Sequence, residues 1–148
     1  MKLNCLLCAA GSLWLCACTT TSNHHVNNTE NLKGTWTCLS ATVEGKALPK
    51  ETTELLGLTL TENRYKTEKG SEVLFDSSYT IDPSEDPKQI NMVGTEGDIA
   101  GKEAPGIYSL EKDILRICYV MPGLPRPKEF QSQAGSKTYL VSWKRKSP

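Results

Sequence analysis

The residue types that most often carry catalysis are sparse in this chain of 148 residues. Its two histidines, His24 and His25, are adjacent in a polar segment near the N-terminus, so Ser–His and Cys–His pairs are not expected in the body of the chain. Catalysis by paired carboxylates needs two acids that face one site. The acids here stand in turns or on the polar face of alternating segments. We therefore expect no enzymatic activity.

Two patterns could hold a metal ion, and both are weak. Neighbouring histidines on a flexible tether make a poor site. Asp82, Ser84 and Asp86 have the alternating spacing of a calcium loop, but the glycine and bidentate glutamate of such a loop do not follow. Solvated turn residues are the simpler interpretation, and we expect no metal and no cofactor.

Two cysteines in the body of the chain, Cys38 and Cys118, offer redox chemistry. A disulfide between them would close a loop of about 80 residues and would contribute on the order of 4 kcal/mol in the chain-entropy model. The alternative is a pair of free thiols that pack as small apolar side chains. The sequence leaves both open, because it does not show whether the two Cα atoms come within bridging distance.

Arg126 stands between Pro125 and Pro127, which restrict the backbone and so the direction of the guanidinium. In this setting the guanidinium could bind an anion through two hydrogen bonds. It could also cap carbonyl groups at one end of a barrel and stack on Trp36.

Short alternating segments, separated by turn residues, must position these side chains. The predicted strands are residues 35–43, 56–60, 64–68, 73–81, 88–93, 106–110, 114–120 and 138–144. Alternation puts Val73, Phe75, Tyr79 and Ile81 on one face of their strand. Because no segment has a helical period, we predict an all-β fold, a small antiparallel barrel of about eight or nine strands.

Aromatic side chains are expected to occupy the barrel interior. A Gly34-x-Trp36 sequence at the start of the first strand suits a closed barrel, where the indole plugs one end and its N–H finds a carbonyl at the rim. The other aromatic side chains either line a ligand cavity or fill a small barrel completely. The candidates for such a cavity are Phe75, Tyr79, Tyr108 and Tyr119.

The first 31 residues have the composition of a targeting segment and a polar tether. Lys2 precedes a short apolar stretch that ends in Leu15-Cys16-Ala17-Cys18. This tetrapeptide resembles the bacterial lipobox, which implies cleavage before Cys18 and attachment of acyl chains such as palmitate to that residue. Thr19, in place of Asp, favours the outer membrane within this resemblance, with the protein facing the periplasm. An ordinary signal peptide is the alternative.

The predicted organisation is a signal peptide at residues 1–17, a lipidated Cys18 and tether at 18–31, and a barrel at 32–146. With 17 acidic and 17 basic side chains, the formal net charge is zero, which does not suit a nucleic-acid-binding protein. No later stretch approaches the roughly 20 apolar residues of a spanning helix. The N-terminal lipid is thus the membrane contact we expect, on a monomer.

Several motifs together resemble a small lipocalin-like domain that is abundant in planctomycete bacteria. They are residues 32–36 (LKGTW), 45–49 (GKALP), 106–110 (GIYSL) with Asp113, 115–119 (LRICY) and 122–130 (PGLPRPKEF). The resemblance implies a lipocalin-like barrel in a secreted or envelope protein and brings no established activity. It favours the stacking of Arg126 on Trp36, because in lipocalins a late arginine covers the first-strand tryptophan. Cys38 departs from the pattern, where an apolar residue is expected.

Two functions remain in view. The first is a lipid-anchored barrel that binds a small apolar ligand. The second is an interaction module that grips an envelope macromolecule through its loops, chiefly residues 94–104 and 121–128.

Overall fold

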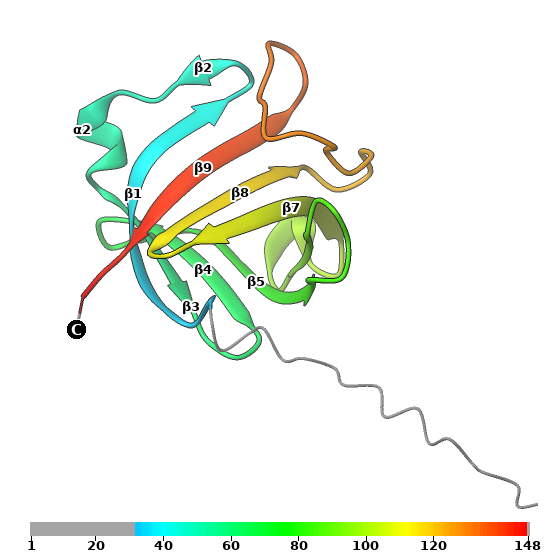
Figure 1. Ribbon diagram of the computed structural model, residues 1–148, viewed down its shortest axis with the longest axis horizontal. Helices are drawn as coiled ribbons and strands as arrows, with labels where there is room; N and C mark the ends of the chain where they lie inside the picture. The colour runs from blue at the N-terminus through cyan, green and yellow to red at the C-terminus, as the bar shows by residue number, and fades with distance from the viewer. Residues whose placement is uncertain (1–31, 148) are drawn as a thin grey trace, which may run out of the picture.

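The structure is a computed structural model that describes residues 32–147; the expected signal peptide, Cys18, the paired histidines and the whole tether lie outside these residues. The described chain forms one sheet in the order β2-β1-β3-β4-β5-β6-β7-β8-β9, and β1 also pairs with β9 (Figure 1). Each neighbouring pair is antiparallel. The predicted all-β barrel is confirmed: eight of the nine strands close on each other, and β2 is an extra strand.

The strands are longer than predicted at several ends. Their bounds are β1 Gly34–Val43, β2 Lys46–Ala47, β3 Leu56–Leu60, β4 Arg64–Lys69, β5 Glu72–Asp82, β6 Gln89–Gly94, β7 Glu103–Glu111, β8 Ile114–Val120 and β9 Thr138–Arg145. Two short helical elements lie between the described strands: α2, Lys50–Thr53, and the single turn η1, Gly97–Ile99. Among the described residues, no helix has the length and apolar character needed to cross a membrane.

β1 holds the barrel together because it pairs on both edges. Its first half pairs with β3, from Gly34 opposite Leu60 to Thr37 opposite Gly57. Almost its whole length pairs with β9, from Trp36 opposite Arg145 to Val43 opposite Tyr139. A strand with both edges paired has no free edge groups, so closure leaves the barrel without an exposed edge there.

Two bulges change which residues face the interior. The β1–β9 register shifts between Cys38 and Ser40, which leaves Leu39 half exposed. The β4–β5 register shifts between Thr67 and Glu68, so the extra residue on β5 breaks the alternation predicted from Val73. The prediction that Val73 shares the inward face is therefore wrong, since its side chain is 50% exposed.

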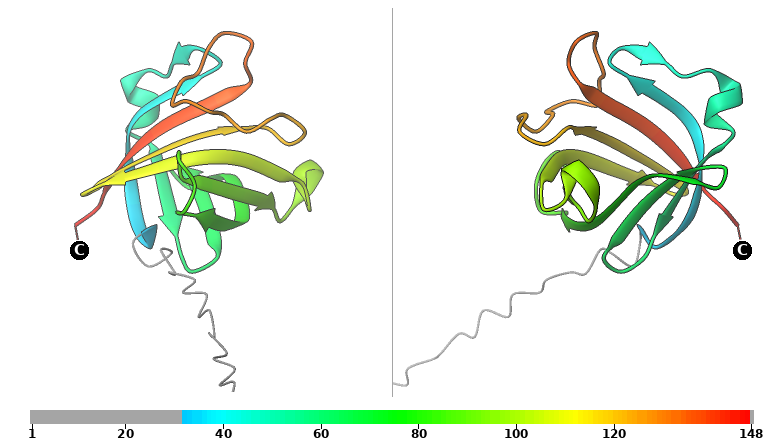
Figure 2. Two further views of the ribbon diagram at one scale, coloured as in Figure 1. Left: turned by 45° about the vertical axis from the view of Figure 1, so that its right-hand side comes forward. Right: turned by 180° about the vertical axis from the view of Figure 1, so that it is seen from behind.

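The two ends of the barrel differ. The hairpins β3–β4 and β7–β8 and the start of β1 lie at one end, where Leu32, Trp36 and Leu60 are buried (Figure 2). The β4–β5 hairpin, α2, η1 and the β8–β9 connection lie at the opposite end. We call these the closed end and the open end.

Most of the segment 121–137, between β8 and β9, packs on the outside of the barrel. Ile107 and Cys118 are paired neighbours on β7 and β8, are buried, and do not belong to the central core cluster. The Cys118 thiol donates to the carbonyl of Gln131 at 3.4 Å. The Arg116 guanidinium lies 4.9 Å from the Phe130 ring centre. This segment therefore covers a second, smaller apolar layer outside the sheet.

Candidate functional site

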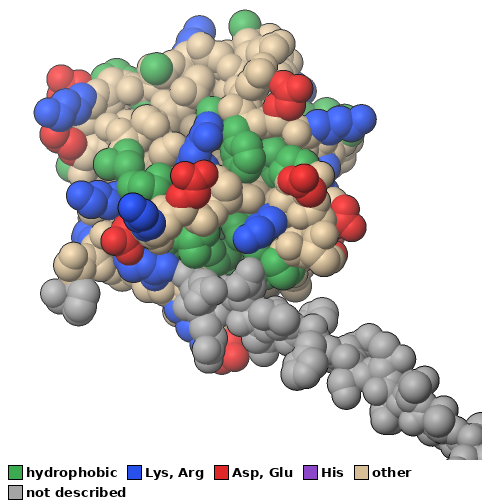
Figure 3. Space-filling view, in the orientation of Figure 1, with side chains coloured by type: hydrophobic (Ala, Val, Ile, Leu, Met, Phe, Trp, Pro, Cys, Tyr) green, Lys and Arg blue, Asp and Glu red, His purple; other side chains and the backbone are tan. Residues whose placement is uncertain are grey.

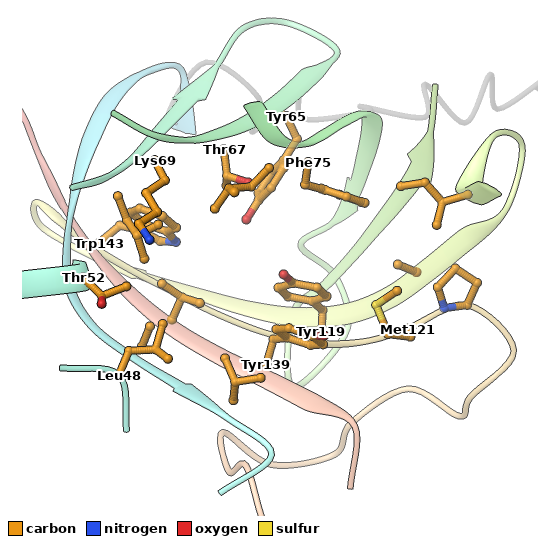
Figure 4. A pocket seen from close by; sticks show the side chains of 18 residues that line it. Leu48, Thr52, Tyr65, Thr67, Lys69, Phe75, Tyr119, Met121, Tyr139 and Trp143 are labelled. Atoms are coloured by element: carbon orange, nitrogen blue, oxygen red, sulfur yellow. The ribbon is translucent and has the colours of Figure 1, made fainter. Parts of the chain in front are cut away.

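A cavity of about 430 Å³ occupies the open half of the barrel (Figure 4). Its size falls within the range of about 300–1,000 Å³ common to small-molecule sites. The wall consists of Ala41, Val43, Leu48, Thr52, Leu56, Tyr65, Thr67, Lys69, Leu74, Phe75, Ile99, Ala104, Tyr119, Met121, Pro122, Tyr139, Val141 and Trp143. Most of these side chains are apolar or aromatic, so the cavity is suited to an apolar molecule.

The wall is built by period-2 alternation in strands that meet through the sheet. On β9, Tyr139, Val141 and Trp143 point inward, and Tyr139 lies opposite Tyr119 on β8. On β4, Tyr65, Thr67 and Lys69 point inward, and Thr67 lies opposite Phe75 on β5. The open-end elements add further side chains to the mouth.

Four aromatic rings form a continuous series across the cavity. Tyr139 and Tyr119 stack with ring centres 5.0 Å apart, and Phe75 stacks on Tyr119 at 6.5 Å. Tyr65 meets Phe75 edge to face at 6.0 Å. Because such pairs are stabilised beyond the area that they bury, we expect this part of the wall to be rigid.

Burial changes the acidity of the tyrosines in the series. Desolvation raises the pKa of Tyr65 well above its ordinary value, with a smaller contribution from Tyr119. Desolvation likewise raises the pKa of Tyr119, and Tyr139 adds to the shift. Both hydroxyls are therefore neutral at pH 7 and act as hydrogen-bonding groups in a mainly apolar wall.

Lys69 and Trp143 supply polar nitrogen atoms at one end of the cavity (Figure 4). Lys69 is the charged member of the wall. Trp143 is 2% exposed, and its Nε1 has no hydrogen-bond partner among the described residues.

Two of the four residues predicted to line a ligand cavity do line it: Phe75 and Tyr119. Tyr79 and Tyr108 do not, and their prediction as cavity residues is corrected. Both are nearly fully buried in the packed core. The Tyr79 hydroxyl donates to the carbonyl of Thr61 at 2.9 Å, in the β3–β4 connection at the closed end. The interior is therefore filled at one end and hollow at the other.

Trp36 lies at the closed end with its side chain fully buried. Its indole N–H donates to the carbonyl of Leu32 at 3.1 Å. The arginine that stacks on it is Arg145, at 4.1 Å from the ring, and the Arg145 guanidinium also donates to the carbonyl of Lys33 at 2.5 Å. The prediction that Arg126 covers Trp36 is thus wrong.

Arg126 caps carbonyl groups in another place. Its Nη1 donates to the carbonyls of Ile90 at 3.1 Å and Gly106 at 2.6 Å, and its Nη2 donates to Asn91 Oδ1 at 2.6 Å. Ile90 and Gly106 face each other across the β6–β7 pair. Arg126 therefore anchors the 121–137 segment to the barrel, with its donors used inside the protein.

Cys38 and Cys118 are free thiols, so of the two alternatives that the sequence leaves open the structure has the unbridged pair. β9 lies between β1 and β8, which separates the two cysteines by at least two strand spacings, roughly 10 Å. Bridged Cα atoms lie within about 7 Å. Cys38 also packs against the central core from inside, whereas Cys118 bonds to the outer segment. Desolvation raises the pKa of Cys38 to about 11 and also raises that of Cys118.

The acidic groups do not gather into a site. Among residues 32–147, no group of three His, Cys, Asp or Glu side chains could hold a metal ion. Asp82 Oδ1 accepts hydrogen bonds from the backbone N–H of Ser84 at 3.0 Å and from its hydroxyl. On the face shown in Figure 3, acidic and basic side chains are interspersed.

Sequence reasoning missed Lys69, Tyr139, Trp143 and Arg145 as residues of interest. Alternation could have found most of them, because Lys69 follows Tyr65 and Thr67 at steps of two. Which of them lie close together depends on how the barrel closes, and this cannot be predicted from a local sequence pattern. Searches of family models, of curated proteins and of solved structures found no match to this chain.

Proposed function

We propose that this barrel is a binding module that holds a small, largely apolar ligand in its cavity without transforming it. The observation that carries the proposal is the division of the interior into a packed closed end and a hollow of about 430 Å³ at the open end. A barrel that served only as a stable scaffold would gain from filling that hollow, because an unfilled apolar cavity is destabilising.

The mouth of the cavity favours the same function. Leu55, Leu74 and Met121 are 53%, 49% and 36% exposed at the open end. Leu74 and Met121 also line the cavity, and the Leu55 carbonyl accepts from the N–H of Gly70 beside the β4–β5 hairpin. Exposed apolar side chains that rim an apolar hollow are typical of ligand entry sites.

Native mass spectrometry of the protein, purified gently from its own host, tests the proposal. A bound mass that is lost on denaturation is the expected result, and it identifies the ligand directly. Thr67→Phe, which places a ring inside the cavity, should abolish that mass. Lys66→Phe is the matched control, since Lys66 is the neighbour of Thr67 and pairs with Glu68 on the outer face. A bare mass for the unmodified protein would contradict the proposal and favour a macromolecular partner for the loops.

We further propose that the protein is anchored in the cell envelope by acylation of Cys18, as the lipobox resemblance implies. Two or more acyl chains hold a protein stably at a bilayer, because each buried CH₂ contributes about 0.8 kcal/mol. Cys18→Ala should move the protein from the membrane fraction to the soluble fraction or leave it unprocessed. Unchanged membrane association of that variant would refute the anchor.

A further inference from the structure

Lys69 is unusual for a residue in an apolar wall. It is the charged side chain among the eighteen that line the cavity. No ion pair of Lys69 is found within residues 32–147, and its cross-strand neighbour, Glu72, is exposed and does not belong to the wall. Lys69 lies at the rim of the cavity and is itself exposed, so its ammonium keeps contact with water. A cation in this position, beside an apolar wall, attracts an anionic group and repels a cationic one.

Trp143 adds a second, independent observation. The protein has two described indoles, and they differ in hydrogen bonding. Trp36 Nε1 is satisfied by the carbonyl of Leu32 at 3.1 Å, whereas Trp143 Nε1 is buried without any partner in the described chain. Buried donors are nearly always paired in folded proteins, so an unpaired donor in a cavity wall points to an acceptor that arrives with a ligand.

The sheet register places the two residues in one row that runs across β9, β1, β3 and β4. Trp143 lies opposite Cys38 on β1, and Lys69 lies opposite Leu56 on β3. The β1–β3 pairing ends with Thr37 opposite Gly57, and Cys38 and Leu56 are the next residue on each strand beyond that pair. Figure 4 shows the Lys69 amine and the Trp143 indole nitrogen at the same end of the cavity.

We propose that the ligand is an amphiphile with a single anionic head, of which a medium-chain carboxylate is the simplest form, and that Lys69 and Trp143 hold the head. This inference rests on the proposed function, because it names the ligand class for the same cavity. One carboxylate oxygen accepts from Lys69 Nζ and the other from Trp143 Nε1 once the flexible lysine side chain makes room. The apolar body then lies along Leu56, Phe75 and Tyr119.

Charge and volume restrict the class further. The wall offers one cation, so a head with two negative charges would enter a mainly apolar site with one charge uncompensated. The volume of 430 Å³ equals about fourteen water-sized volumes, which corresponds to a molecule of roughly fourteen heavy atoms, head group included. A monoanion of about the size of dodecanoate meets both conditions.

Calorimetric titration of the full chain with dodecanoate and with 1-dodecanol tests the proposal. These probes share a chain and differ in the head. Dodecanoate should bind at least about tenfold more tightly, as expected for about 1.4 kcal/mol from a charge-assisted contact. Lys69→Met should remove this preference and leave the affinity for dodecanol unchanged. Lys66→Met, on the outer face of the same strand, should retain it.

The outcomes separate the two proposals. Equal binding of both probes, or a preference that survives Lys69→Met, would overturn the anionic head while leaving an apolar binding site in place. Absence of binding by either probe would overturn the proposed function as well.

An NMR measurement tests the indole contact directly. In the full chain labelled with ¹⁵N at tryptophan, the Trp143 N–H signal is assigned from its loss in Trp143→Phe. Saturation with dodecanoate should shift that signal downfield, while the Trp36 signal, already hydrogen-bonded to Leu32, stays in place. Binding of dodecanoate without movement of the Trp143 signal would exclude the indole from the head site.

Discussion

Trp36 is the side chain on which the closed end of the barrel depends. It is fully buried, its indole N–H is satisfied by Leu32, and Arg145 lies over its ring. Arg145 also donates to the carbonyl of Lys33, so one guanidinium ties the start of β1 to the end of β9. The contacts of Arg145 join residues more than a hundred positions apart, and they fasten the first strand of the barrel to the last.

Arg145→Met should therefore lower the free energy of unfolding by about 2 kcal/mol, the sum of a cation–π contact and a partly buried charged hydrogen bond. Chemical denaturation measures this loss. Arg64→Met is the control, because Arg64 is an exposed arginine that pairs with Asp76 on the neighbouring strand. An equal loss in both variants would show that Arg145 acts as an ordinary surface charge.

The prediction that Arg126 stacks on Trp36 was wrong because the last strand is longer than predicted. Alternation in the predicted strand, residues 138–144, places Tyr139, Val141 and Trp143 inward, and this strand ends at residue 144. One more step of two reaches Arg145, which is the next inward position. The alternation pattern therefore leads to Arg145, the arginine that stacks on Trp36, but the predicted strand ended one residue too early.

At the scale of elements, residues 121–137 behave as a strap over β6, β7 and β8. Arg126 fastens it to the carbonyls of Ile90 and Gly106, and Gln131 covers the thiol of Cys118. The reaction of Cys118 with a reagent in solution therefore requires this segment to open.

Arg126→Gln should accelerate the alkylation of Cys118 on the order of tenfold, as expected if the opened segment becomes more populated by about 1.4 kcal/mol. Peptide mass spectrometry after timed treatment with iodoacetamide at pH 8 measures the rate at each cysteine. Cys38 is the internal control, because it packs against the central core and its pKa is raised to about 11 by burial. The same acceleration at Cys38 would indicate general destabilisation in place of local opening.

Strands were predictable from alternation, and the exceptions are at the bulges. Phe75, Tyr79 and Ile81 face inward as predicted, whereas Val73 lies beyond the β5 bulge and faces solvent. A bulge is a shift in the pairing of two strands, so it cannot be predicted from the alternation within either strand alone. Cys38 and Cys118 differ from this case, because alternation alone gives the face of each; their separation depends on β9, which lies between β1 and β8.

At the scale of the whole molecule, the barrel is half core and half cavity. From the sequence, aromatic side chains were expected in the interior, but whether they fill it or line a cavity was open. Tyr79 and Tyr108 belong to the packed half and Tyr119 to the hollow half, although all three are tyrosines at inward strand positions. The three tyrosines differ in their position along the barrel axis. That position depends on the stagger between neighbouring strands, which the period-2 pattern does not give.

Buried tyrosines in both halves predict a loss of stability at high pH. Desolvation raises the pKa of Tyr79 to about 12 from an ordinary value near 10, and the pKa values of Tyr65 and Tyr119 are also raised. Between these values the unfolded chain has released protons that the folded chain retains, so stability is fully present below pH 10 and falls as pH rises toward 12. Each such tyrosine contributes a slope of up to about 1.4 kcal/mol per pH unit. Urea unfolding at pH 9, 10, 11 and 12 measures the total slope, and Tyr79→Phe should reduce it by one tyrosine's share. A stability that is constant over this range would mean that these hydroxyls reach water in the native state, which would contradict the packed closed end and the narrow cavity together.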